Sequence, residues 1–188
     1  MRAAITAGRL TAQIGGVISD NPQAYALQRL QGTGIPAVCC ERRAFASARE
    51  FETALIRELE KYEVELVVLA GFMRLLSGYF IGRFRGRVMN IHPALLPAFP
   101  GLNAQAQALA YGAKVAGCTV HFVDEGMDSG PIILQAAVAV AEDDTPQSLS
   151  DRILQVEHVL YPRAVGLYCD GRLQIEGRRV KILGKEGV

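Results

Sequence analysis

Short apolar runs alternate along the chain with segments of helical periodicity, and this alternation limits the possible folds more than any other feature. We expect helices at residues 22–32, 47–62, 102–112 and 145–168, and strands at residues 12–20, 35–40, 64–71, 86–92, 116–123 and 131–140. Such an order is typical of strands that are buried beneath covering helices. It predicts the α/β class, with a doubly wound, mostly parallel sheet.

The two ends of the chain depart from this regular order. Asp170 and Gly171 form a dipeptide that is typical of hairpin turns, so we expect a C-terminal β-hairpin. Residues 1–10 read as the back half of a helix, although a doubly wound domain usually opens with a strand and a glycine-rich turn. The first strand is therefore expected to be missing, which would leave its neighbours with unpaired backbone groups. On this interpretation Met1 is an internal start and the natural protein is longer.

Composition limits the partners of the chain. Its 188 residues are 50% hydrophobic, which suits one globular domain over residues 1–188. Lysine plus arginine number 20 against 19 aspartate plus glutamate, and a net charge of +1 gives no argument for nucleic acid or an anionic membrane as a partner. No apolar run approaches the ~20 residues that cross a bilayer. The four cysteines show neither C-x-x-C nor framework spacing, which indicates thiols in a reducing, cytoplasmic compartment.

Two polar residues close the predicted strand at residues 86–92. Asn90 and His92 lie two residues apart, so in a strand they point to the same face. Pro93 cannot donate to a ladder and is expected to end the strand. In open α/β sheets ligands bind beyond the carboxyl ends of strands, so we expect this pair in a binding crevice. The loop at residues 72–76 follows another buried strand and is expected to line the same crevice.

A polar loop between the last two apolar strands supplies three carboxylates, Asp124, Glu125 and Asp128. An acid held against His92 would favour the protonated imidazole and let it donate a hydrogen bond to a developing oxyanion. Together with the Asn90 amide, this group would suit a tetrahedral intermediate at a carbonyl carbon, which is acyl-transfer chemistry. Spacing alone leaves open which of the three acids contacts His92, and a solvated turn is an equal alternative for this loop.

Other polar residues favour plainer interpretations. His121 lies inside a predicted strand and is expected to be structural, and His158 on the long helix is expected to be structural or peripheral, while its neighbour Glu157 is ambiguous. The histidines are dispersed and no cysteine lies at ligand spacing, so we expect no metal site. No G-x-S-x-G elbow is present, and the Cys39–Cys40 pair lies in an apolar strand, which argues against a serine or cysteine nucleophile.

Three motifs in this sequence resemble those of one known family. They are VVLAGFMRLLS, NIHPALLPAFPGLNAQAQAL and GCTVHFVDEGMDSGPIILQ, and the likeness extends from Met1 to the predicted hairpin. Together they look like phosphoribosylglycinamide formyltransferase, a folate-dependent family of purine synthesis with a Rossmann-like formyltransferase fold. The resemblance implies that the amine of glycinamide ribonucleotide attacks the formyl carbon of 10-formyltetrahydrofolate, with no metal and no covalent enzyme intermediate.

The resemblance also implies roles for individual residues. Asn90 and His92 would stabilise the tetrahedral oxyanion, and Asp128, which is the family's acid, would orient His92 and help to move a proton through water. The implied folate-binding residues are Phe72, Met73, Arg74, Leu75, Leu76, Val123, Asp124 and Glu125, with backbone contacts at Arg74 and Leu76. The implied substrate-binding residues are Met73, Pro93 and Glu157, of which Glu157 would bind ribose hydroxyls.

The chain differs from the family's pattern in two places. We expect it to lack the strand and Gly-Ser-Asn turn that usually hold the substrate phosphate. Ala48 also takes the place of an arginine that some members carry near the phosphate, with Arg49 adjacent. Residues 1–188 are therefore expected to bind glycinamide ribonucleotide weakly and to bind folate better.

Three alternative functions remain open from the sequence. Formyltetrahydrofolate deformylase would deliver the formyl group to water, but that family usually has an N-terminal regulatory domain and another residue in place of Pro93. Methionyl-tRNA formyltransferase generally carries a C-terminal RNA-binding domain and more basic charge. A degenerate, non-catalytic folate-binding protein would bind folate without turnover. We expect small-molecule partners, and either a monomer or a homodimer.

Overall fold

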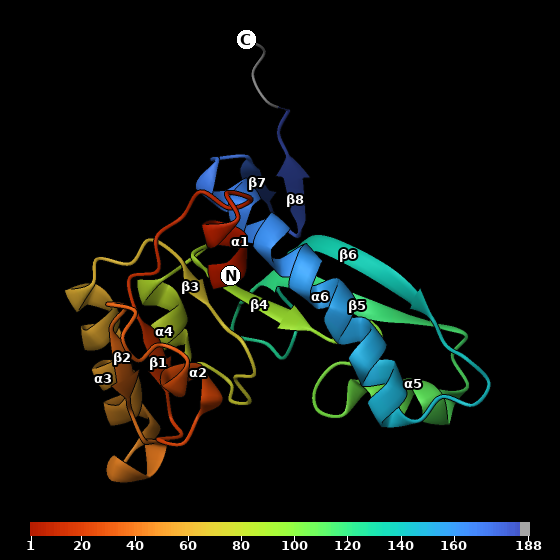
Figure 1. Cartoon of the computed structure of the whole chain (residues 1–188), viewed down its shortest axis with the longest axis horizontal. Helices are drawn as coiled ribbons and strands as arrows, with labels where there is room; N and C mark the ends of the chain where they lie inside the picture. Colours follow the sequence, from red (N-terminus) through yellow and green to blue (C-terminus); the bar gives the residue numbers. More distant parts are fainter. Residues whose placement is uncertain (185–188) are drawn as a thin grey trace.

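The strands of the protein form two sheets in the computed structural model, which describes residues 1–184 (Figure 1). The smaller sheet has the order β1-β2, and the larger has the order β3-β4-β5-β6-β8-β7. The strands are β1 (Val17–Ser19), β2 (Ala37–Cys39), β3 (Val67–Val68), β4 (Val88–His92), β5 (Val115–Phe122), β6 (Ile132–Ala139), β7 (Leu173–Glu176) and β8 (Arg179–Ile182). The predicted α/β class is confirmed.

The two longest helices begin at residues whose side chains cap them. The helices are α1 (Arg2–Thr6), α2 (Tyr25–Gln28), α3 (Ala48–Lys61), α4 (Gly78–Arg83), α5 (Ala104–Tyr111) and α6 (Pro146–Cys169), with a 3-10 turn at Arg42–Ala44. Ser47 and Thr145 cap α3 and α6 by accepting a backbone N–H three residues on, as N-cap side chains do. Helix α2 begins later than predicted, because Asn21 uses its side chain to accept the N–H of Gln23 in a turn. Within residues 1–184 no helix is both long and apolar enough to cross a bilayer.

Strands β1 and β3 each pair on one side only among the described residues. The N–H of Val17 donates to Pro36 and the carbonyl of Ser19 accepts from Cys40, so both residues turn toward β2. Because neighbouring residues of a strand point their backbone groups to opposite sides, those of Ile18 face away from β2. Strand β3 likewise pairs only with β4. These open edges agree with the expected absence of a central strand.

Two apolar clusters pack on opposite faces of the larger sheet, and β4 shows how its residues divide between them. Met89 belongs to the cluster beneath α6, whereas Val88 belongs to the cluster packed on α3 and α4. Figure 1 shows α6 lying across β4, β5 and β6, with α3 and α4 on the other side of the molecule. Buried Tyr161 connects α6 to the backbone of β4 and of the residue after β3, since its hydroxyl is 2.8 Å from the Leu69 carbonyl and 2.9 Å from the Met89 carbonyl.

The C-terminal hairpin is confirmed, and its turn lies further along the chain than Asp170–Gly171. Strands β7 and β8 are antiparallel, with Glu176 opposite Arg179, so Gly177 and Arg178 form the turn. Gly177 has φ +59°, a value that glycine adopts without strain. Asp170 and Gly171 instead end α6, where Gly171 has φ +66°. A glycine with positive φ serves both a hairpin and a helix end, which explains why the dipeptide was misleading.

Candidate active site

Strand β4 brings Asn90 and His92 to one face of the larger sheet, as the alternation of side chains predicts. Strands β4 and β5 are antiparallel, with Asn90 opposite His121 and His92 opposite Thr119. Directly opposite residues of antiparallel strands point to the same face, so these four polar side chains gather there. We call this face the site face. The intervening residue Ile91 points to the α6 side.

The His92 ring is almost fully buried and lies between two oxygen acceptors. Its Nδ1 is 3.3 Å from Oδ2 of Asp128, and its Nε2 is 2.8 Å from the backbone carbonyl of Phe99. Only 4% of the residue is exposed. An imidazole donates from both nitrogens only when it is protonated, and here each nitrogen faces an oxygen that can accept.

Asp128 has an uncommon backbone conformation and is held by a neighbouring loop. Its φ is +49°, which is uncommon for a residue other than glycine and is often found at functional sites. Its Oδ2 accepts the backbone N–H of Gly101 at 2.9 Å as well as facing His92. Its Oδ1 is 3.7 Å from Nε2 of His121. The carboxylate therefore lies between two imidazoles.

The other two acids of this loop have different neighbours. Asp124 accepts the hydroxyl of Ser129 at 2.6 Å and the N–H of Gly126 at 3.1 Å, and so organises its own loop. Glu125 is exposed and lies against Gly78, at the start of α4. Of the three carboxylates, the structure places Asp128 against His92.

Thr119 anchors the loop that follows His92. Its buried hydroxyl donates to the Ala94 carbonyl at 2.6 Å and accepts the Leu96 N–H at 3.0 Å. The Gln135 side chain donates to the same hydroxyl and to the Leu96 carbonyl, both at 2.9 Å. These bonds fix the loop that places the Phe99 carbonyl and the Gly101 N–H around His92 and Asp128.

We expect Thr119→Val to lower the free energy of unfolding by at least about 2 kcal/mol. The substitution keeps the shape of the side chain, but it leaves buried groups of Ala94 and Leu96 without a partner, at about 1–3 kcal/mol each. Urea unfolding measures the difference. Thr53→Val is the matched control, because the Thr53 hydroxyl donates to an exposed carbonyl within α3. Equal losses in the two variants would contradict the anchoring role of Thr119.

The loop after β3, residues 70–77, exposes several side chains to solvent, and its last residue is bound by a side chain of α3. Met73 is 73% and Leu75 is 63% exposed, whereas Leu76 is buried in the core, so only its backbone can face a ligand. Buried Glu52 of α3 accepts both the N–H and the hydroxyl of Ser77. Arg74, at the tip, pairs with Asp20 at 3.3 Å, beyond the end of β1.

Exposed apolar side chains gather on the three loops around the His92 end of β4. Met73 and Leu75 lie on the first loop, Leu102 on the second and Met127 on the third, and each is at least half exposed. The Met127 sulfur lies against Gly101, so the second and third loops touch. Exposed apolar surface next to buried polar groups is typical of a site for an organic ligand.

Several residues implied by the resemblance lie outside this hydrogen-bonded group. Pro93 and Val123 directly follow β4 and β5 and are half-buried. Glu157 is half-buried on α6, and burial raises its pKa. Its charge contributes to the raised pKa values of the neighbouring Cys118 and Tyr161, for which burial is the larger cause. Among residues 1–184 it shares no hydrogen bond with Asn90, His92 or Asp128.

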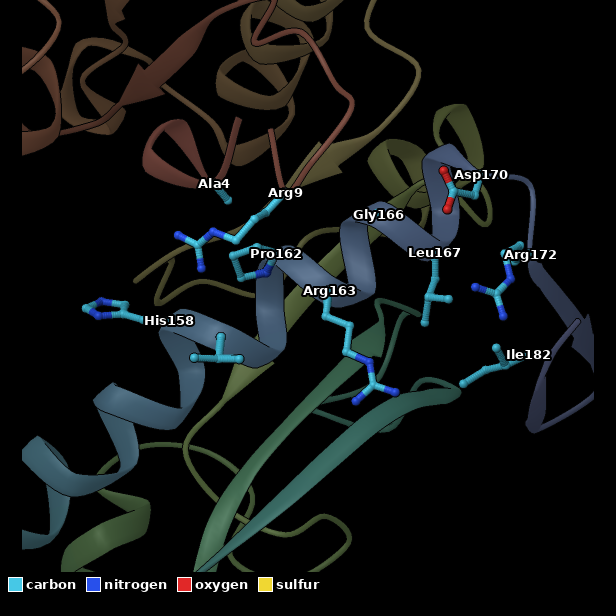
Figure 2. Close-up of a pocket in the computed structure, with 11 residues that line it drawn as sticks. Ala4, Arg9, His158, Pro162, Arg163, Gly166, Leu167, Asp170, Arg172 and Ile182 are labelled. Carbon is cyan, nitrogen blue, oxygen red and sulfur yellow. The ribbon is translucent and has the colours of Figure 1, made fainter. Parts of the chain in front are cut away.

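Two further residues that sequence reasoning raised also lie apart from His92. The Arg49 guanidinium stacks on the Tyr79 ring, 3.1 Å from its centroid, so it is engaged within the α3–α4 pair. His158 lies on the outer surface of α6, where Figure 2 shows it near Arg9 at one end of a pocket of about 440 Å³. This pocket is lined by α1, α6 and the residues around β7 and β8.

His121 is the one member of the polar group that sequence reasoning assigned to a structural role. It is 2% exposed, and its Nε2 lies 3.4 Å from Nδ2 of Asn90. Burial lowers its pKa below the ordinary value for histidine. Its position opposite Asn90 follows from the pairing of β4 with β5, and that register would have identified it.

The family model described as "Formyl transferase" matches residues 2–165. The chain belongs to the formyl transferase family.

This formyl transferase is 49% identical over 155 residues to the trifunctional purine biosynthetic protein adenosine-3 of Drosophila melanogaster, covering 82% of the chain but only 12% of that protein. It is 45% identical to the phosphoribosylglycinamide formyltransferase of Bacillus subtilis, covering 79% of the chain and 76% of that protein. Its structure matches that of glycinamide ribonucleotide transformylase 1 from Symbiobacterium toebii with a TM-score of 0.94 and 52% identity, over 97% of this chain and 86% of that one.

A deformylase structure shares the fold of this formyl transferase. The formyltetrahydrofolate deformylase of Pseudomonas syringae matches with a TM-score of 0.90 at 24% identity, over 97% of this chain and 60% of that one. A likeness at this identity concerns the fold alone.

Proposed function

We propose that this formyl transferase moves the formyl group of 10-formyltetrahydrofolate to the amine of glycinamide ribonucleotide, in purine biosynthesis. The observation that carries the proposal is the arrangement of Asn90, His92 and Asp128 at the end of β4. The relatives named phosphoribosylglycinamide formyltransferase support the same substrates. We propose further that residues 1–188 act as a single domain. The four cysteines, all free, suit a cytoplasmic location.

The proposed reaction begins when the amine nitrogen attacks the formyl carbon, and negative charge then develops on the formyl oxygen. The Asn90 amide N–H and the His92 Nε2–H would donate to that oxygen. In this structure the Nε2 side of His92 faces the Phe99 carbonyl, so the substrate oxygen would replace that carbonyl as its acceptor. Collapse of the intermediate breaks the bond to the folate nitrogen and leaves the formyl group on the amine.

Asp128 has two roles in this proposal. Its contact with Nδ1 orients the His92 ring and stabilises its positive charge. The attacking amine loses a proton, and the leaving folate nitrogen gains one. Asp128 would also help, through water, to carry the proton from the first to the second. The Gly101 N–H holds the carboxylate in place for both tasks.

The three loops around this end of β4 are proposed to bind the two substrates. Exposed Met73 and Leu75 offer apolar surface to the folate ring, while the backbone of Arg74 and Leu76 offers hydrogen bonds. The proposed folate site also takes in Phe72 and the start of the third loop, which comprises Val123, Asp124 and Glu125. Met73, Pro93 and Glu157 are proposed for glycinamide ribonucleotide.

Isothermal titration with each substrate separately tests this assignment. We expect a folate analogue without a transferable formyl group to bind, and glycinamide ribonucleotide to bind more weakly but to saturation. Glycinamide without the ribose phosphate is the control ligand and should show no binding. Binding of the folate analogue alone would overturn the assigned acceptor and favour a deformylase or a non-catalytic folate-binding protein.

A further inference from the structure

The side chain of Asn90 must present a hydrogen-bond donor to the substrate oxygen, yet an asparagine amide has two nearly equal-shaped ends. If the amide turned by 180° it would present its carbonyl oxygen, which repels an oxyanion. Some neighbour must therefore fix the orientation of the amide. The residue directly opposite Asn90 in the antiparallel pair β4–β5 is His121, whose Nε2 lies 3.4 Å from Nδ2.

The tautomer of His121 follows from its other nitrogen. Nδ1 is 2.8 Å from the backbone carbonyl of Phe122, which can only accept, so Nδ1 carries the hydrogen. In the neutral ring Nε2 then holds a lone pair and can only accept. An accepting Nε2 favours the nitrogen end of the Asn90 amide and disfavours its oxygen end, since two acceptors would repel each other.

The surroundings of His121 decide whether its ring stays neutral. Burial, at 2% exposure, is the largest influence and lowers its pKa. The charged or titratable groups that act on it are Asp128 and Asp124 from the loop after β5, which oppose this shift, and His92 from β4, which adds to it. Burial prevails over the two carboxylates, so the neutral ring persists at neutral pH.

We propose that His121 is a positioning residue. It accepts one N–H of the Asn90 amide at Nε2, which keeps the amide nitrogen toward His121 and leaves the other N–H of that nitrogen for the substrate oxygen. This proposal rests on the proposed function and deepens it. Asn90 touches the reacting atoms, whereas His121 acts through Asn90. A merely structural role for His121 would affect folding stability without depending on Asn90.

A double-mutant cycle separates the two roles. His121→Phe keeps a buried ring but removes the acceptor, so we expect the single-turnover rate of formyl transfer to fall at least about tenfold. This loss should be smaller than the loss of about 10²–10³-fold that follows removal of an oxyanion donor itself. KM for the formyl folate should hardly change. In an Asn90→Ala background the same substitution should cost less than about twofold, because the amide that it orients is gone.

Two further variants control for rescue and for stability. His121→Gln offers a carbonyl oxygen near the position of Nε2 and should restore most of the lost rate. Val120→Ala makes a cavity at the neighbouring buried residue of β5, on the α6 side, and should lower stability while leaving the rate unchanged. Equal rate losses from His121→Phe in both backgrounds would overturn the proposal.

Imidazole ¹⁵N NMR of the unmutated protein gives an answer even if His121→Phe does not fold. We expect the His121 signals of a neutral ring with hydrogen on Nδ1, persisting below the ordinary histidine pKa of about 6.5. A hydrogen on Nε2 at neutral pH would overturn the proposal. If the unmutated protein binds both substrates but transfers no formyl group, the proposed function fails together with this role. If the protein is active and the rate losses of His121→Phe and Asn90→Ala are additive, only the role of His121 is refuted.

Discussion

His92→Ala is expected to lower kcat for formyl transfer by about 10²–10⁴-fold, the usual loss when a positioned acid or oxyanion donor is removed. The ring is buried at the end of β4, between the Asp128 carboxylate and the Phe99 carbonyl, so water cannot readily replace it as a donor of the same geometry. KM values for both substrates should change little, because the ring is proposed to act mainly on charge that develops in the transition state. Steady-state kinetics with each substrate varied in turn measures both constants.

His158→Ala is the matched control for this variant. It removes the same side chain from the exposed surface of α6, which the proposed mechanism does not use. We expect its kcat to remain within about twofold of the unmutated value, as for most exposed substitutions. A His92→Ala protein that kept its kcat within threefold would contradict the proposed donor role of His92.

Asp128→Asn is expected to lower kcat by about 10²–10⁴-fold as well, for a different reason. The amide oxygen can still accept the Gly101 N–H, so the loop should keep its place. The charge that stabilises a protonated His92 is lost, and so is the base proposed to move the proton from amine to folate.

Asp143→Asn is the control, since it makes the same chemical change at an exposed position in the turn before α6. Folding of both variants is checked by urea unfolding before the rates are compared. If Asp128→Asn retained full activity, the proton would have to move by another route. Asp124 is an alternative acid in the same loop, although its carboxylate is engaged by Ser129 and Gly126.

The main elements of the fold could be predicted because their signals are local. The apolar period predicted the two long helices almost to the residue, and the structure shows their first turns capped by Ser47 and Thr145. Alternation along β4 correctly placed Asn90 and His92 on one face, away from Ile91. Gly171 misled because a positive φ suits a helix end as well as a hairpin turn.

The rest of the site depends on contacts between segments that are far apart in the sequence. His121 faces Asn90 only because β5 returns antiparallel to β4 in one register, which no local pattern specifies. The contact of Asp128 with His92 depends on a left-handed backbone conformation and on the N–H of Gly101 in another loop. Spacing alone could therefore identify three candidate acids but could not choose among them.

The central claim is tested most directly by following a labelled formyl group from 10-formyltetrahydrofolate in the presence of the purified protein. With glycinamide ribonucleotide present, we expect the label to appear as the formyl amide of that substrate, at a rate that falls to background when the substrate is omitted. Release of the label as formate, at the same rate with or without glycinamide ribonucleotide, would contradict the claim and identify water as the acceptor.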